Sequence, residues 1–109
     1  MNMMNLYEYQ LQAMKTAVYH STHAVMYPAL GLAEEAGEVA GKIAKMLRDD
    51  IKLEDQREKI EAEMGDVLWM LAALAKGCNL SLQTIAEKNL EKLAKRSDKG
   101  TIQGEGDER

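Results

Sequence analysis

Residues 33–39 read Ala-Glu-Glu-Ala-Gly-Glu-Val, and residues 61–67 read Glu-Ala-Glu-Met-Gly-Asp-Val. Both segments contain a carboxylate followed three positions later by a second carboxylate, with a glycine between them and a valine directly after them. The paired residues are Glu35 with Glu38, and Glu63 with Asp66. Residues three apart on a helix lie on the same face, so each pair is expected to present two adjacent oxygen donors. If the two helices face each other, all four carboxylates converge.

The apolar residues around these acids indicate two helices that pack against each other. At about 100° per residue, the apolar side chains of each segment fall within one arc, and the acids lie at its border. In the first helix the arc contains Leu32, Ala36, Val39, Ile43, Met46 and Leu47. In the second helix it contains Ile60, Met64, Val67, Leu68, Leu71, Leu74 and Ala75. The four carboxylates are therefore expected at the margin of the core.

Carboxylates held at such a margin repel one another and lose solvation, which is unfavourable unless protons or a cation compensate. A hard divalent cation is the simplest compensator. Because neither motif contains Cys or His, oxygen ligation favours magnesium, manganese or calcium over zinc. A solvated acidic surface is the plain alternative in a chain with 29% charged residues. Two aligned copies beside apolar stripes favour the metal site.

Composition limits the classes of protein that fit. The chain has 109 residues and fits one domain, and its many Ala, Leu, Glu, Lys and Met residues are typical of a soluble helical protein. The net charge of −4 argues against nucleic acid as the main partner. Cys78 is the only cysteine, which excludes an intrachain disulfide and favours the cytoplasm. No secretory signal is recognised, and the longest apolar run, residues 67–75, is too short to cross a membrane.

Hydrophobic periodicity and capping residues predict an all-α fold, a four-helix bundle-like protomer. The helices are expected at residues 4 to about 20, 28 to 48 or 49, 53–76 and 82–96. Gly77 is the expected cap of the third helix, and Ser81 that of the fourth. The third helix is apolar on every side over residues 67–75, so part of it, including Trp69, is expected to form a subunit interface. Residues 97–109, rich in glycine, are expected to be a mobile tail.

Several polar residues outside the two motifs are candidates for ligand binding. Lys42 and Lys45 continue the arc of the first acidic pair, and they either neutralise neighbouring acids or bind phosphate oxygens. On the fourth helix the candidates recur at i, i+3 and i+7 on one face, and they are Asn89, Lys92 and Arg96. Spacing alone favours a solvated basic face for these three residues. His20 and His23 fit a turn or the lining of a base pocket, together with Tyr27, better than a metal site.

The order of these motifs in a helical chain of this size resembles the MazG-like nucleotide pyrophosphohydrolases of the all-α NTP pyrophosphatase superfamily. The matching segments extend over most of the chain. They are Gly31–Val39, Glu63–Leu68, Asn89–Arg96 and Lys99–Asp107. The resemblance covers roughly residues 5–109, with residues 1–96 as a single MazG-like helical domain.

This resemblance implies hydrolysis of a nucleoside triphosphate between its α and β phosphates, which clears surplus or non-standard nucleotides. Magnesium, or manganese in its place, would be held by Glu35, Glu38, Glu63 and Asp66. The triphosphate would contact Lys45, Asn89, Lys92 and Arg96. Glu34 or Glu35 is the candidate to orient or deprotonate the attacking water. Members of the family are usually dimers or tetramers, so a homodimer or homotetramer is expected.

Two other readings fit parts of the pattern. A di-iron carboxylate bundle would require Glu-x-x-His motifs, and the chain has Glu-x-x-Glu and Glu-x-x-Asp instead. A non-enzymatic helical module would use the acids to bind a partner or a structural ion. Turnover of a nucleotide distinguishes the enzyme from this module.

Overall fold

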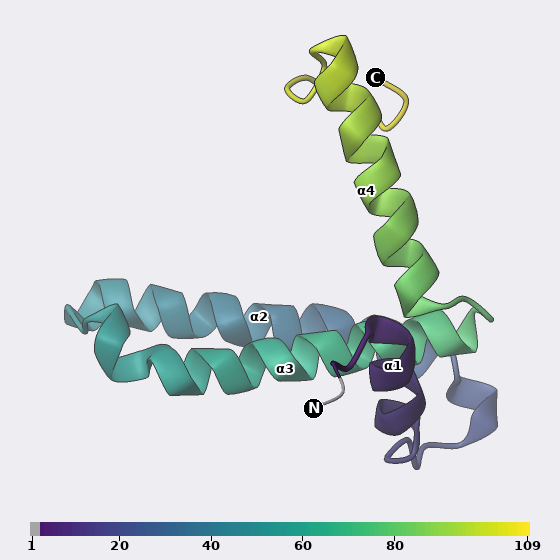
Figure 1. Ribbon diagram of the computed structural model, residues 1–109. Helices are drawn as coiled ribbons and strands as arrows, with labels where there is room; N and C mark the ends of the chain where they lie inside the picture. Colours follow the sequence, from purple (N-terminus) through teal and green to yellow (C-terminus); the bar gives the residue numbers. More distant parts are fainter. Residues whose placement is uncertain (1–2) are drawn as a thin grey trace.

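The computed structural model describes residues 3–109, and all regular secondary structure in this part of the chain is helical, without any strand (Figure 1). The elements are α1 (Leu6–Met14), the short 3-10 helix η1 (Ser21–His23), α2 (Met26–Asp49), α3 (Leu53–Gly77) and α4 (Leu82–Lys99). The prediction of an all-α fold with four α-helices is confirmed.

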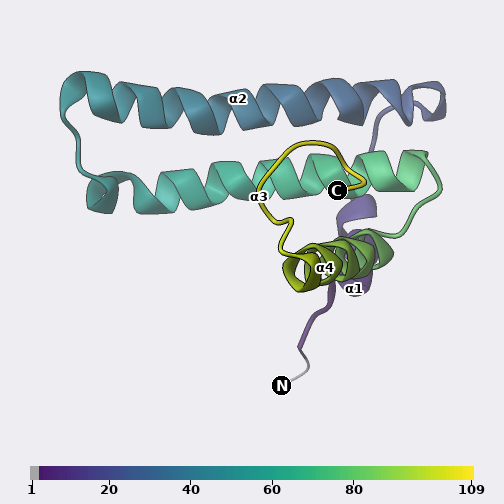
Figure 2. The same cartoon turned by 90° about the horizontal axis from the view of Figure 1, so that it is seen from above.

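The two long helices form an antiparallel hairpin (Figures 1 and 2). Helix α2 ends at Asp50, which adopts a left-handed conformation with φ of 54°, and the Ile51 N–H then donates to the Met46 carbonyl at 2.9 Å. This bond pairs a carbonyl at the end of the helix, and the left-handed residue reverses the chain within a few residues. The hairpin therefore brings the two acidic motifs to neighbouring positions on facing helices.

Helix α1 ends earlier than the sequence predicts, at Met14 rather than near residue 20. The Thr16 N–H donates to the Ala13 carbonyl at 3.0 Å, and the Thr16 hydroxyl donates to the same carbonyl at 2.7 Å. A hydroxyl that bonds locally to the backbone competes with continuation of the helix. Residues 15–20 consequently connect α1 to η1.

The other helix ends differ from expectation by a few residues. Helix α2 begins at Met26, and Pro28 lies in its first turn, where a missing N–H does not remove a helical bond. Gly77 is the last residue of α3 rather than its cap, and a side chain there would collide with the carbonyl of Ala24. Ser81 caps α4 as predicted by accepting from the Thr84 N–H, and Gly100 ends that helix in a left-handed conformation.

The buried core lies around the second half of α3, where α1, the start of α2 and the start of α4 meet it. Small residues allow this close approach. The buried apolar side chains of this region are Ala13, Met70, Ala72, Ala73, Ala75 and Leu82, with Pro28 also enclosed.

Two side chains fix α1 against this core. Gln10 is buried and donates to the carbonyls of Ala72 and Leu80 at 3.2 and 3.1 Å. Its side-chain oxygen accepts from the Leu82 N–H at 2.9 Å. Trp69 donates from Nε1 to the carbonyl of Ala13 at 3.2 Å. Helix α1 therefore covers part of the Trp69 side chain, which is half-buried, and its assignment to a subunit interface stays a prediction.

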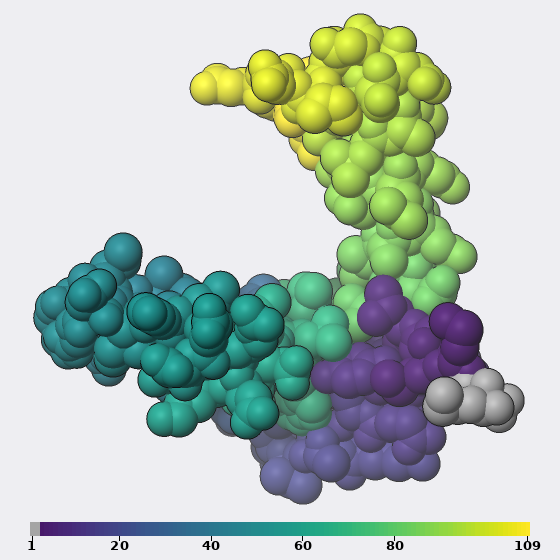
Figure 3. Space-filling view, turned by 60° about the vertical axis from the view of Figure 1, so that its left-hand side comes forward, coloured from purple at the N-terminus to yellow at the C-terminus, as the bar shows by residue number. Residues whose placement is uncertain are grey.

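The single chain is open in shape. Its radius of gyration is 16.8 Å, whereas a compact chain of this size has about 13 Å. Helix α4 rises from the body of the molecule, and open space separates its far end from the hairpin (Figure 3). Large apolar side chains are exposed along the hairpin, including Leu47 at 82% and Met64 at 57%. Within the described residues, no helix is long and apolar enough to cross a membrane.

Candidate metal centre

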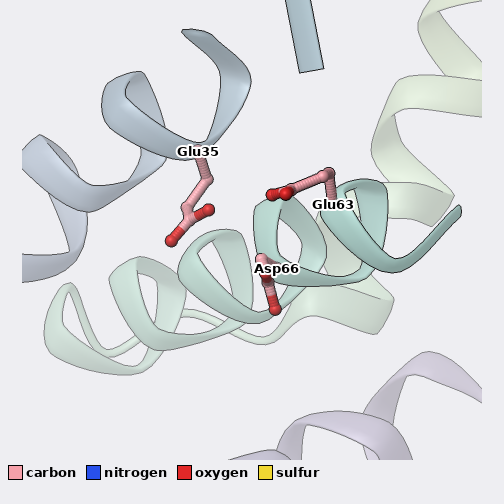
Figure 4. Close-up of side chains that lie close together, drawn as sticks. All are labelled: Glu35, Glu63 and Asp66. Atoms are coloured by element: carbon pink, nitrogen blue, oxygen red, sulfur yellow. The ribbon is translucent and has the colours of Figure 1, made fainter. Parts of the chain in front are cut away.

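Three of the four motif carboxylates converge between α2 and α3. One carboxylate oxygen from each of Glu35, Glu63 and Asp66 lies within 4.8 Å of the others. Glu35 extends from α2 toward Glu63 on the facing helix, and Asp66 lies about one turn along from Glu63 (Figure 4). We call these three residues the carboxylate cluster. Their convergence follows from the antiparallel pairing of the two helices.

Two oxygens of the cluster lack a hydrogen-bond partner. Oε2 of Glu35 and Oε2 of Glu63 are both shielded from solvent, and the structure gives neither a donor. Buried polar atoms are almost always hydrogen-bonded, because an unsatisfied one loses its interaction with water. A divalent cation coordinated by oxygen compensates two such atoms at once. The residues of the cluster therefore fit a hard metal ion.

The electrostatics of Glu35 agree with this interpretation. Burial raises the pKa of its carboxyl above the ordinary value, and the charges of Glu38, Asp66, Glu34 and Glu63 raise this pKa further. A carboxylate surrounded in this way is difficult to keep ionised without a neighbouring positive charge. A bound cation would restore the ionised form.

Glu38 lies beside the cluster rather than within it. It is exposed and lines a hollow of about 400 Å³ between α2 and α3, together with Glu34 and Glu63. The same hollow is lined by two cationic side chains, Lys42 and Lys45. Basic groups beside a carboxylate-bound cation are suited to an anion that also contacts the metal. The prediction that Lys45 accompanies the acidic motifs agrees with this arrangement.

Two further residues interact with the carboxylate cluster, and they are Lys42, a candidate from the sequence, and Tyr9, which was not selected from it. Nζ of Lys42 lies 3.9 Å from Oε1 of Glu63. Burial raises the pKa of Tyr9 on α1, and the charge of Asp66 raises this pKa further. Lys42 shares a helix face with the first motif, and the sequence left open whether it neutralises neighbouring acids or binds phosphate oxygens. No sequence signal identifies Tyr9, because its proximity depends on how α1 packs.

The polar residues of α4 do not reach the cluster within one chain. Asn89 is exposed, and α4 leads Lys92 and Arg96 away from the hairpin (Figure 1). Arg96 is 6% exposed and, with Lys92, contacts Asp107 of the C-terminal segment. Their assignment to the triphosphate stays a prediction.

The histidines lie in the connection before α2. Nδ1 of His20 accepts from the Thr22 N–H at 3.1 Å and so caps η1, which agrees with a turn role. Tyr19 contacts the ring of Tyr27, with centroids 4.7 Å apart, and stands edge-on to Trp69 at 6.3 Å. A base pocket at these aromatic residues stays a prediction.

The fold and the site together define an all-α protein with a carboxylate site between two antiparallel helices. Residues 22–101 match the family described as the MazG nucleotide pyrophosphohydrolase domain. The chain therefore belongs to the MazG family, and the resemblance found in the sequence is confirmed. Proteins of this family typically depend on a divalent metal, and the carboxylate cluster fits one.

A curated relative supports the same assignment over nearly the whole chain. The chain is similar to the Gene 37 protein of Mycobacterium phage L5, with 41% identity over 109 residues. This alignment covers 93% of the present chain and 96% of the phage protein. No solved structure matches the chain.

Proposed function

We propose that this protein is a magnesium-dependent nucleoside triphosphate pyrophosphohydrolase. It cleaves NTP or dNTP between the α and β phosphates and releases a nucleoside monophosphate and pyrophosphate. Membership of the MazG family supports the reaction class. The observation that carries the proposal is the pair of shielded, unpartnered oxygens of Glu35 and Glu63, because a cation would compensate both of them beside a hollow in which a polyphosphate can also bind.

The residues of the site have distinct roles in this reaction. Glu35, Glu63 and Asp66 hold the metal, and Glu38 completes the carboxylate set from the adjoining hollow. When bound, magnesium, or manganese in its place, neutralises charge on the phosphate oxygens.

The remaining side chains act on the substrate and the water. Lys45 binds phosphate oxygens from its position in the hollow beside the acids. A carboxylate oxygen of Glu34 or Glu35 orients the attacking water and accepts its proton. Glu34 lines the hollow, and Glu35 belongs to the cluster, so both lie where a phosphate and a water meet.

The active form is proposed to be a homodimer or homotetramer. An open apolar groove of about 570 Å³ lies along the hairpin, and its lining residues are Ala36, Val39, Met64, Gly65, Val67, Leu68 and Leu71. Exposed apolar grooves of this kind are typical of subunit contacts. A second copy on this groove would also allow Asn89, Lys92 and Arg96 of one chain to approach the carboxylates of another.

The product pattern tests the function directly. Purified protein is incubated with each common NTP and dNTP, and with dUTP and ITP, with and without magnesium, and the products are separated by anion-exchange chromatography. Monophosphate and pyrophosphate that form only with magnesium are expected. Glu63→Gln should reduce their formation about 100-fold, whereas the replacement of Glu61, an exposed glutamate on the same helix, by Gln should not.

Other outcomes exclude the proposal. Diphosphate and orthophosphate would place the cleavage at a different bond. Metal binding without turnover of any nucleotide would favour the non-enzymatic module. The cellular role that the reaction implies is removal of surplus or non-standard nucleotides in the cytoplasm.

A further inference from the structure

The C-terminal segment, residues 101–109, folds back along α4 and ends in a close contact with it (Figure 1). We call this segment the C-terminal loop. Oδ1 of Asp107 accepts from Nζ of Lys92 at 2.7 Å and from a terminal nitrogen of Arg96 at 3.2 Å. The Asp107 carbonyl accepts from the same Arg96 nitrogen at 2.7 Å. One residue of the loop thus engages both cations that the sequence assigns to a triphosphate.

The loop has internal contacts that shape it independently of α4. The Arg109 guanidinium donates to the carbonyls of Thr101, Ile102 and Gly106 at 3.1, 2.9 and 2.7 Å. Gly106 has a φ of 88°, a conformation that glycine adopts without steric strain. Because these bonds lie within the loop, the loop can separate from α4 without losing them.

The contact between Asp107 and the two cations is poorly matched. The Arg96 side chain is only 8% exposed, and its Nε is buried without a hydrogen-bond partner. The Asp107 side chain, in contrast, is 78% exposed and offers one carboxylate to two cations. A phosphate group has more acceptor oxygens and more negative charge than a carboxylate, so it satisfies such a pair more fully.

The surroundings favour an anion as well. A hollow of about 220 Å³ lies between α4 and the loop. Its acidic lining consists of Glu91, Asp107 and Glu108. Its basic lining is larger and consists of Lys88, Lys92, Lys95, Lys99 and Arg109. When Asp107 leaves, the excess of positive charge in this hollow increases.

We propose that Asp107 is an intramolecular substitute for a substrate phosphate, and that a polyphosphate must displace the C-terminal loop from Lys92 and Arg96 in order to bind. The proposal rests on the proposed function, in which these two cations contact the triphosphate. The pair of Lys92 and Asp107 is exposed to solvent and contributes little free energy, so displacement of Asp107 by a more highly charged ligand is favourable. The apparent affinity for the polyphosphate is therefore the intrinsic affinity multiplied by the fraction of molecules in which the loop is open.

Binding of inorganic pyrophosphate to the full-length, metal-free protein tests this competition. Isothermal titration in EDTA compares the wild type with Asp107→Ala and with Glu105→Ala. Glu105 is an exposed acid of the same loop, so its replacement makes the same change in net charge. Asp107→Ala is expected to tighten binding about three- to tenfold, and Glu105→Ala by less than about twofold. Unchanged or weaker binding to Asp107→Ala, or no binding to either protein, would overturn the proposal.

Hydrogen exchange of the backbone amides of residues 102–108 provides a second measurement on the wild type. Displacement predicts faster exchange in this segment when pyrophosphate is added. Slower exchange would show that the loop closes over the ligand, and it would overturn displacement. Neither experiment uses metal or turnover. An absence of nucleotide cleavage would thus contradict the proposed function alone, whereas an unaltered affinity of Asp107→Ala would contradict the loop competition alone.

Discussion

Oε2 of Glu35 on α2 and Oε2 of Glu63 on α3 are both shielded from solvent without a hydrogen-bond partner, in two side chains whose carboxylate oxygens approach within 4.8 Å of each other. Two facing helices that each leave one carboxylate oxygen unsatisfied repel each other at this point. The apolar contacts of the hairpin hold them together despite this repulsion. A cation between the two helices would convert the unfavourable contact into a stabilising one.

Magnesium is therefore expected to stabilise the folded protein. A ligand that binds only the native state at about 100 times its dissociation constant adds about 2.7 kcal/mol. Thermal unfolding with increasing magnesium should show a rising Tm for the wild type and for Glu61→Gln. For Glu63→Gln, most of this rise in Tm should be absent, and the rate of nucleotide hydrolysis should be about 100-fold lower. An equal rise in Glu63→Gln would show that the metal binds elsewhere.

The raised pKa of Glu35, caused first by burial and then by the acids around it, predicts how the stability of the metal-free protein depends on pH. Above the ordinary carboxyl value of 4.5 and up to the raised pKa, the native state binds more protons than the unfolded state. In that interval, stability falls as pH rises. Tm measured in EDTA from pH 4.5 upward should decrease for the wild type.

Glu35→Gln serves as the control for this dependence, because glutamine does not titrate. Its Tm should fall less steeply over the same interval, and added magnesium should flatten the wild-type profile, since metal binding requires the ionised carboxylate. Parallel profiles for the two proteins in EDTA would contradict the assignment of the effect to Glu35.

Gln10 is expected to be important for stability. Its side-chain amide bonds to the carbonyls of Ala72 and Leu80 and to the N–H of Leu82, so its removal leaves buried backbone groups unpaired. Gln10→Ala should lower the free energy of unfolding by about 2–3 kcal/mol. Urea denaturation measures this change, and Gln12→Ala, at an exposed position of the same helix, should change it by less than about 0.5 kcal/mol. A similar decrease in the free energy of unfolding of both variants would mean that the effect comes from helix propensity and not from the hydrogen bonds of Gln10.

The parts of the structure that could be predicted from the sequence depend on local patterns. The acidic pairs and their apolar neighbours repeat with the period of a helix, so the facing of α2 and α3 was predictable from Glu35, Glu63 and their surroundings. Ser81 was recognisable as a cap, because its bond to the Thr84 N–H spans only three residues.

The remaining features depend on contacts between distant residues. Nothing in α3 itself indicates that α1 covers part of Trp69 and accepts its Nε1–H. Tyr9 and Gln10 belong to α1, and their roles arise only when that helix crosses α3. Asp107 lies fifteen residues from Lys92, and no periodic pattern predicts that the chain reverses after Gly100.

The apolar groove predicts that one substitution dissociates the assembly. Met64 lines the groove, is 57% exposed, and would be covered by a second copy. A lysine there places an unpaired charge in the contact, which is strongly unfavourable. Light scattering coupled to size exclusion should show a mass that is a multiple of 12.2 kDa for the wild type and close to 12.2 kDa for Met64→Lys. Met4→Lys, which makes the same change at a position 63% exposed before α1, should retain the wild-type mass. A wild type that elutes as a single chain, or a Met64→Lys variant of unchanged mass, would exclude this groove as the interface.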